Sequence, residues 1–166
     1  KGTNRKKFLS NEAQKYTWLD LGSSFIQNEI LSAFLFAQLE QSKEITNRRL
    51  EIWEKYESTM NQLKKFGVDI PDIPKNIKHN GHIFYLILKT EELQKAFIKK
   101  MRKNKIQVVF HYVPLHSSPF GKENTKSVGN LSKTEYVSTR LVRLPLWIGI
   151  EKFQDDIVRK ILSFWN

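Results

Sequence analysis

The stretch that decides the fold is Ile83-Phe84-Tyr85-Leu86-Ile87-Leu88, followed directly by Lys89-Thr90-Glu91-Glu92. The apolar and aromatic run is typical of a buried strand. The threonine predicts a helix N-cap, and the two acids after it suit the positive end of a helix dipole. The basic run over 99–103 suits the negative end. The expected apolar stripe of this helix consists of Leu93, Ala96, Phe97 and Met101.

Downstream of this strand and helix, the pattern predicts two more strands and two more helices. Ile106-Gln107-Val108-Val109-Phe110 and Leu141-Val142-Arg143-Leu144 are the expected strands. Between them lies a loop over 113–130 rich in Pro, Ser, Gly and Asn, and then a short helix that Ser132 can cap and that runs to Arg140. A last helix over about 151–164 should bury Phe153, Ile157, Ile161 and Phe164. The order predicts a small α+β layer, with helices packed on one sheet.

Upstream of this α+β layer, the residue pattern predicts one long helical segment. Gly22-Ser23-Ser24 offers a turn and a helix N-cap, and apolar residues then recur at helical spacing from Ile26 to Leu63. Gly67 supplies a stop. An unbroken helix of about 40 residues would be about 60 Å long, which exceeds a compact domain. We therefore expect a break near Gln41-Ser42-Lys43, or else a helix that bridges two domains.

Composition narrows the possible functions. The 166 residues contain no cysteine, which excludes disulfides, thiolate metal sites and cysteine nucleophiles. Lys and Arg number 28 against 17 acids, so the net charge is +11, which favours anionic partners, although a general bias toward lysine is the preferred explanation. No apolar run approaches the roughly 18 to 20 residues that span a bilayer. A soluble cytoplasmic protein is expected, and the absence of an initial Met suggests a piece of a longer chain.

The segment Phe110-His111-Tyr112-Val113-Pro114-Leu115-His116 is the strongest candidate for a binding site. A strand ends there and a loop begins, and the imidazoles of His111 and His116 and the Tyr112 hydroxyl can donate to phosphate or sugar oxygens. Composition alone favours the simpler interpretation, a capped strand end with two surface histidines. With four histidines and no adjacent carboxylate, a metal site is not expected.

Other kinds of site have weaker support. No glycine-flanked nucleophile elbow is present, which argues against a serine hydrolase. Gly22-Ser23-Ser24 ahead of a helix could bind phosphate, but an ordinary N-cap accounts for it. The basic residues Arg48-Arg49 and the 99–103 run lack interleaved aromatic side chains, so a nucleic-acid or protein-binding module is only the alternative function.

Read together, several segments resemble the DegT/DnrJ-type sugar aminotransferases. The resemblance runs in register over nearly the whole chain. Its segments are Tyr16-Thr17-Trp18-Leu19-Asp20-Leu21-Gly22-Ser23-Ser24-Phe25, Ala33-Phe34-Leu35-Phe36-Ala37-Gln38-Leu39-Glu40, Arg48-Arg49-Leu50, Gly81-His82-Ile83-Phe84-Tyr85, the histidine segment above from Val109 to His116, and Leu141-Val142-Arg143-Leu144-Pro145-Leu146.

The resemblance implies a fold, a cofactor and substrates. The fold is the C-terminal small domain of the aspartate-aminotransferase-like (type I PLP) architecture. Pyridoxal phosphate carries an amino group from glutamate to a nucleotide-linked 4-keto-6-deoxy sugar in a homodimer, with no nucleic-acid or membrane partner. The implied Schiff-base lysine lies in a Ser-Phe-His-x-Thr-Lys-Asn type motif upstream of Lys1, so no catalytic residue is expected in this chain, and the chain alone should be inactive.

The resemblance also assigns residues and regions. Ser23 and Ser24 would approach the cofactor phosphate of the neighbouring subunit. His111, Tyr112 and His116 would face the sugar and its pyrophosphate, and Asn4 and Arg5 would lie near the site entrance. Residues 1–24 would be the tail of a large domain, 25–66 a connecting helix or kinked pair of helices, and 67–166 the small domain. The first helix carries Phe34, Phe36 and Leu39 on more than one side and is expected to pair with a second copy of the chain.

Overall fold

The computed structural model describes residues 9–10, 25 and 27–165. The chain divides into two units between Ser42 and Lys43, and each unit is described by itself. Ser23, Ser24, Asn4 and Arg5 lie outside the described residues. The predicted domain borders at 24 and 66 stay a prediction.

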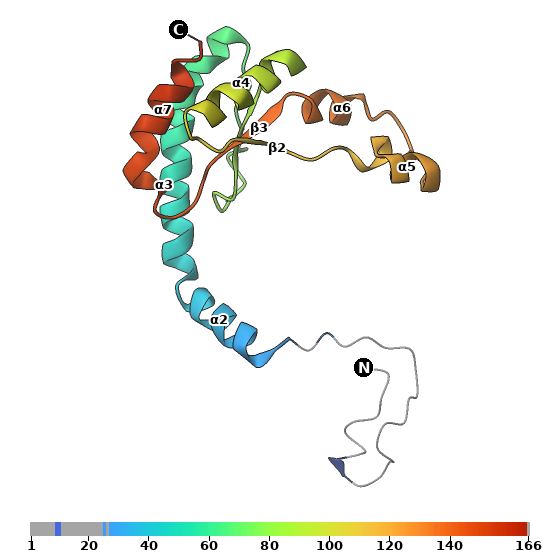
Figure 1. Ribbon diagram of the computed structural model, residues 1–166. Helices are drawn as coiled ribbons and strands as arrows, with labels where there is room; N and C mark the ends of the chain where they lie inside the picture. Colours follow the sequence, from blue (N-terminus) through green and yellow to red (C-terminus); the bar gives the residue numbers. More distant parts are fainter. Residues whose placement is uncertain (1–8, 11–24, 26, 166) are drawn as a thin grey trace. The chain divides into compact units, whose positions relative to one another are not determined.

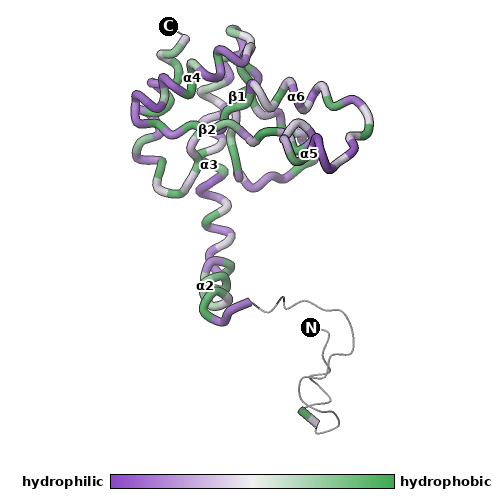
Figure 2. The backbone as a smooth tube through the Cα atoms, turned by 45° about the vertical axis from the view of Figure 1, so that its right-hand side comes forward, coloured by the Kyte–Doolittle hydropathy of each residue, from purple (hydrophilic) through white to green (hydrophobic). Residues whose placement is uncertain are grey.

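The first unit contains helix α2, Glu29–Glu40. Its N-cap is Asn28, whose Oδ1 accepts a hydrogen bond from the Ile30 amide over 2.8 Å. The prediction that Ser23-Ser24 caps this helix is therefore wrong, because Asn28 offers the same capping chemistry one turn later. No side chain of α2 is buried, and Figure 2 colours much of the helix as hydrophobic.

Helix α3, Ser42–Met60, belongs to the second unit from Lys43 on, and the long helical segment is interrupted at Gln41, as predicted. The chain then tightens into the 3₁₀ helix η1, Asn61–Phe66. Gly67 ends it with φ 75°, a left-handed conformation that glycine adopts without a Cβ clash. The predicted stop is confirmed.

Three strands form one antiparallel sheet: β1, Phe84–Ile87; β2, Val109–Phe110; and β3, Leu141–Leu144. Their order is β1-β3-β2, so β3 lies in the middle. Phe84 is paired with Leu144, and Val109 with Arg143. The second strand is shorter than the predicted 106–110: only Val109 and Phe110 pair with β3, whereas Ile106 and Val108 precede the strand with their side chains buried.

Helix α4, Glu91–Lys103, begins as predicted, with Thr90 accepting a hydrogen bond from the Leu93 amide over 3.2 Å. Phe97 and Met101 are buried as expected. Ala96, however, is exposed, and Gln94 takes its place in the interior, where its amide donates to the Leu141 carbonyl oxygen over 2.8 Å. A polar residue with a partner can occupy a core position that the apolar pattern does not predict.

The predicted loop over 113–130 contains two short helices, η2, Leu115–Ser117, and α5, Pro119–Asn124. Helix α6, Ser132–Ser138, follows, and Figure 1 draws α5 and α6 on the side of the sheet away from α3. Ser132 does not cap α6. Asn130 lies ahead of the helix, and its Oδ1 accepts a hydrogen bond from the Ser132 amide over 2.8 Å.

The chain ends in η3, Ile150–Phe153, and α7, Gln154–Leu162. Ile157 and Ile161 are buried as predicted, and Phe164 packs edge-on against Phe97 at 5.2 Å between ring centroids. Phe153 is 58% exposed, so its predicted burial is wrong.

One core joins the sheet to α3, α4 and α7. Figure 1 shows α7 beside α3, and the buried amide of Gln154 donates to the Ile52 carbonyl oxygen of α3 over 2.7 Å. Helices thus pack on a small sheet, which confirms the predicted α+β class. In the part of the chain that the structure describes, no helix is long and apolar enough to cross a membrane.

Candidate functional site

The histidine segment leaves β2 in an unusual conformation. Tyr112 has φ 53°, in the left-handed region that residues with a side chain rarely adopt. The turn brings the Tyr112 ring to 5.0 Å from the His111 ring and 5.7 Å from the Arg143 guanidinium carbon. Such backbone outliers persist where surrounding contacts hold them and are frequent at functional sites. His111 and Tyr112 are thus brought together and stay exposed at a strand end.

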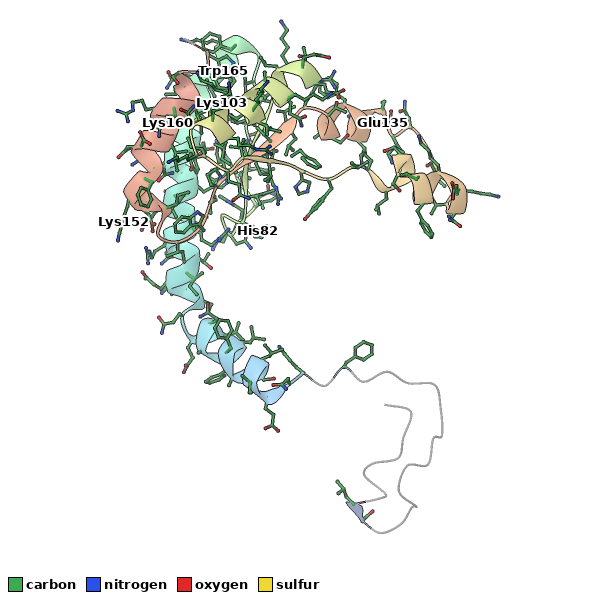
Figure 3. The ribbon with its side chains drawn as sticks, viewed as in Figure 1. His82, Lys103, Glu135, Lys152, Lys160 and Trp165 are labelled. Atoms are coloured by element: carbon green, nitrogen blue, oxygen red, sulfur yellow. The ribbon has the colours of Figure 1, made fainter. Side chains whose placement is uncertain are left out.

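His116 does not join them. Its Nε2 lies 3.3 Å from Glu135 Oε1 of α6, so the imidazole links the η2 turn to α6. Figure 3 shows Glu135 on α6, on the side of the sheet away from Lys160 of α7. A shallow cavity of about 500 Å³ is lined by His111, Tyr112 and Lys133, among others, but not by His116. The structure therefore groups two of the three residues that were expected to face the ligand.

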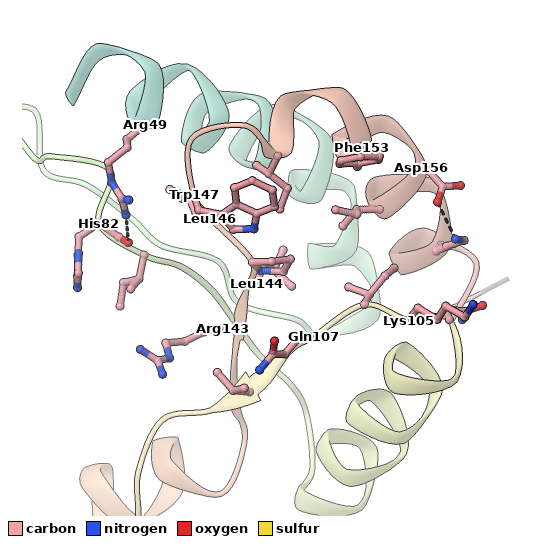
Figure 4. Close-up of a pocket in the computed structure, with 18 residues that line it drawn as sticks. Arg49, His82, Lys105, Gln107, Arg143, Leu144, Leu146, Trp147, Phe153 and Asp156 are labelled. Carbon is pink, nitrogen blue, oxygen red and sulfur yellow. Dashed lines mark hydrogen bonds and ion pairs between the residues drawn. The ribbon is translucent and has the colours of Figure 1, made fainter. Parts of the chain in front are cut away.

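A larger open pocket of about 920 Å³ lies beside the end of β3. Figure 4 shows its lining, which comes from α3, the segment before β1, β3 and the loop that follows it. Its polar and aromatic lining includes Arg49, His82, Lys105, Gln107, Arg143 and Trp147. A pocket that combines apolar walls with a few convergent polar groups is the usual form of a small-molecule site.

Arg143 is the residue that connects the pocket to the histidine segment. It occupies the middle of β3, opposite Tyr85 on one side and Val109 on the other. Its Nε is buried and has no hydrogen-bond partner among the described residues. An unpartnered buried donor costs about 1–3 kcal/mol. Arg143 was not among the predicted site residues, although a lone arginine inside an apolar strand is a signal, if a weak one, for such a role.

The segment before β1, which lines the pocket next to Arg143, is held against α3 by hydrogen bonds to its main-chain oxygens. Arg49 donates to the His82 carbonyl over 2.5 Å, and Trp53 Nε1 donates to the Ile83 carbonyl over 3.0 Å. Gly81 makes the close approach possible, because a Cβ built there would lie 2.9 Å from the Arg49 carbonyl oxygen. Its φ of 60° also favours glycine.

The loop after Trp147, which also lines the pocket, is held in place by the carboxylate of Glu151. Glu151 accepts from Arg48 over 2.6 Å and from the Gly149 amide over 2.5 Å, which ties the loop after Trp147 to α3. The hydrogen bond to its own backbone amide, followed by the one from Arg48, holds the pKa of Glu151 below its usual range. The carboxylate therefore stays ionised and keeps this anchor at neutral pH.

Comparison with known proteins decides the family. A model of the DegT/DnrJ/EryC1/StrS aminotransferase family matches residues 2–162. The chain belongs to this family. Among curated relatives, an uncharacterised protein of Methanocaldococcus jannaschii is 26% identical over 95% of this chain and 41% of its own length. A dTDP-4-dehydro-2,3,6-trideoxy-D-glucose 4-aminotransferase of Saccharopolyspora spinosa is 28% identical over 76% of this chain and 31% of its own length.

Solved structures of aminotransferases share the fold. The sugar aminotransferase CalS13 of Micromonospora echinospora superimposes with a TM-score of 0.78 at 19% identity, covering 98% of this chain and 42% of that one. The chain thus spans about two fifths or less of the length of these relatives. Its architecture is that of the C-terminal part of the aminotransferase fold.

The residues of the larger pocket fit a ligand's anionic groups but not the attachment of pyridoxal phosphate, the cofactor of this family. Attachment requires a lysine amine that is desolvated or otherwise activated. Of the pocket lysines, Lys160 is ion-paired with Asp156 over 2.6 Å, and Lys105 is exposed. Groups of three or more His, Asp or Glu side chains that could hold a metal are absent from the described part of the chain.

Proposed function

We propose that this chain is the substrate-side part of a pyridoxal-phosphate sugar aminotransferase. The complete gene product would move an amino group from glutamate to a nucleotide-linked, dTDP-type 4-keto-6-deoxy sugar. Its specific activity would be that of a dTDP-4-amino-4,6-dideoxygalactose transaminase, serving lipopolysaccharide or other surface-polysaccharide synthesis. The observation that carries the proposal is a cationic pocket in a chain of this family, one of whose lining residues, Arg143, lies 5.7 Å from the Tyr112 ring.

The chain's residues would bind and orient the nucleotide sugar. The exposed imidazole of His111 and the Tyr112 hydroxyl can donate to sugar or pyrophosphate oxygens. His116 would act less directly, through the turn that it holds against Glu135. Aromatic and apolar groups such as Trp147 offer a surface for the sugar ring or the base. Binding of this kind contributes to catalysis by fixing the keto carbon in a reactive orientation.

The cofactor would be held mainly by residues outside this chain. When bound, pyridoxal phosphate supplies an electron sink for amino transfer. Ser23 and Ser24 would contact its phosphate in the neighbouring subunit of a homodimer, and Asn4 and Arg5 would lie at the entrance. With Asn28 as the cap of α2, the case for the two serines rests on the family resemblance alone.

Amino transfer by the complete gene product tests the proposal. The protein, loaded with pyridoxal phosphate, is mixed with glutamate and dTDP-4-keto-6-deoxyglucose, and 2-oxoglutarate is measured together with the amino sugar. We expect equal amounts of both products, and none from residues 1–166 alone. Formation of 2-oxoglutarate by residues 1–166, or its absence with the complete product, would overturn the proposal.

The alternative function, a binding module for nucleic acid or a protein, predicts a different result. The complete product would then lack amino transfer, and nucleic-acid affinity would fall steeply as salt is raised, because counterion release drives such binding. A titration with a mixed-sequence DNA and RNA at two salt concentrations separates the two functions.

A further inference from the structure

We propose that Arg143 is the anion-binding residue of this site and holds a carboxylate or phosphate oxygen of the ligand. The shared chemistry is an anionic oxygen pair facing a guanidinium. It comes either from the amino donor or from the diphosphate of the nucleotide sugar. The choice between these two ligands rests on the proposed function, whereas the anion site itself rests on the geometry around Arg143.

The first observation is the missing partner of Arg143. Four other arginines of the second unit have oxygen partners, whereas the fifth, Arg102, is exposed. Arg48 is paired with Glu151, Arg49 with the His82 carbonyl, and Arg140 with the Tyr136 carbonyl, while Arg159 is paired with Asp156. Arg143 has no hydrogen bond or ion pair with any described residue, and its Nε is buried. Buried donors without partners in native proteins commonly mark the place of a ligand, ion or water.

The second observation is that the Arg143 main chain is fixed. The middle strand pairs on both sides, so the backbone is held by Tyr85 of β1 and Val109 of β2. The Tyr112 ring lies against the guanidinium from a left-handed backbone conformation. A guanidinium that is already positioned loses little freedom when an anion binds, and its planar fork suits two parallel hydrogen bonds to carboxylate or phosphate.

The third observation is the charge of the pocket that Arg143 lines. Arg49, Lys105 and Lys160 line it with Arg143, and the one acid in the lining, Asp156, is already ion-paired with Lys160 and Arg159. In Figure 4 the Arg143 side chain extends toward the side on which Arg49 and His82 are drawn, away from Gln107. The pocket thus presents uncompensated positive charge, which an anionic ligand would neutralise.

Binding of two probe anions to the complete gene product tests this inference. Isothermal titration with dTDP and with glutarate is carried out on the unsubstituted protein and on Arg143→Gln, Arg143→Lys and Arg102→Gln. Arg102 is an exposed arginine on α4 that does not line the pocket and serves as the matched control. We expect Arg143→Gln to weaken one of the two anions at least tenfold, with Arg143→Lys intermediate and Arg102→Gln unchanged.

The probe that loses affinity identifies the source of the anion: dTDP indicates the diphosphate, and glutarate the carboxylate of the donor. If Arg143→Gln weakens neither probe more than Arg102→Gln does, the inference is wrong. Should Arg143→Gln fail to fold, the NMR signal of the Arg143 Nε–H group in the unsubstituted protein replaces it. A shift with one probe supports the anion site, and no shift with either overturns it. Arg143-dependent binding without amino transfer would reject the proposed function and leave the anion site standing.

Discussion

The phenol of Tyr56 in α3 donates a hydrogen bond to the carbonyl oxygen of Pro145 over 3.0 Å, directly after β3 ends. Tyr56 is fully buried, and this bond joins the central helix to the chain segment that enters the pocket loop. Burial disfavours the phenolate and raises the pKa of Tyr56 far above its ordinary value.

Tyr56→Phe should therefore change the dependence of stability on pH. At neutral pH we expect a loss of about 1 kcal/mol, the usual contribution of a neutral hydrogen bond. Tyrosine in the unfolded chain ionises near pH 10, whereas Tyr56 in the folded protein stays neutral, so its contribution is complete below about pH 10 and declines above it. Urea unfolding from pH 7 to 11 measures this. Tyr136→Phe, at a half-exposed position, is the control, and a constant gap between unsubstituted protein and Tyr56→Phe above pH 10 would contradict the prediction.

Gln154→Ala should destabilise the second unit more than Gln62→Ala. Both side-chain amides donate to a helix carbonyl, Gln154 to Ile52 over 2.7 Å and Gln62 to Thr59 over 2.9 Å. Gln154 is 2% exposed and links α7 to α3, whereas Gln62 is exposed. We expect about 1–3 kcal/mol for Gln154→Ala and less than about 0.5 kcal/mol for Gln62→Ala by urea unfolding. Equal losses would show that the buried bond contributes nothing beyond helix propensity.

Gly81→Ala should loosen the pocket wall. The new Cβ would lie 2.9 Å from the Arg49 carbonyl carbon and oxygen, so the segment before β1 must move away from α3. Gly129→Ala is a matched control, because Gly129 also has positive φ, at 78°, but has no atom within 4 Å of a built Cβ. Both substitutions carry a backbone cost of about 1–2 kcal/mol. Beyond this shared cost, only Gly81→Ala should lower the melting temperature and weaken dTDP binding. Similar effects of Gly81→Ala and Gly129→Ala would show that the close approach to Arg49 does not matter.

The exposed apolar side chains of α2 should drive association of residues 1–166. Phe34 is 68% and Phe36 65% exposed, and both lie on a helix with no buried side chain. Contiguous exposed apolar groups of this kind mark interaction surfaces. We expect sedimentation velocity to show dimers that Phe34→Ser with Phe36→Ser converts to monomers. Phe120→Ser, at a 72% exposed position on α5, should have no effect. A monomeric unsubstituted chain at high concentration would reject the prediction.

The sequence was most informative where neighbouring residues determine the conformation. Thr90 caps α4, Gly67 ends η1, and the limits of β3 follow from its own residues. The helix start at Asn28 was missed because two segments four residues apart offer equivalent caps, and the chain can use only one. The apolar pattern also failed at Ala96, because Gln94, with its long-range bond to Leu141, occupies the core position beside Phe97 and Met101 instead.

The site was harder to predict because it depends on contacts between distant segments. The histidine segment stood out from its residues alone, but the separation of His116 from Tyr112 depends on Glu135. Arg143 was not predicted, because a lone arginine in a strand is a weak signal until its surroundings are known to hold no acceptor. The length of β2 likewise depends on the position of β3, and local strand propensity does not encode that position.

The hydrogen bonds that hold the segment before β1 permit substitutions that change which ligand the pocket binds. Arg49 and Trp53 donate hydrogen bonds to the main-chain carbonyl oxygens of residues 82 and 83. Every amino acid has such an oxygen. The side chains at those two positions can therefore be exchanged while the support beneath them stays in place. Enzymes that share this scaffold can acquire different ligand preferences at positions 82 and 83 without first having to rebuild the scaffold itself.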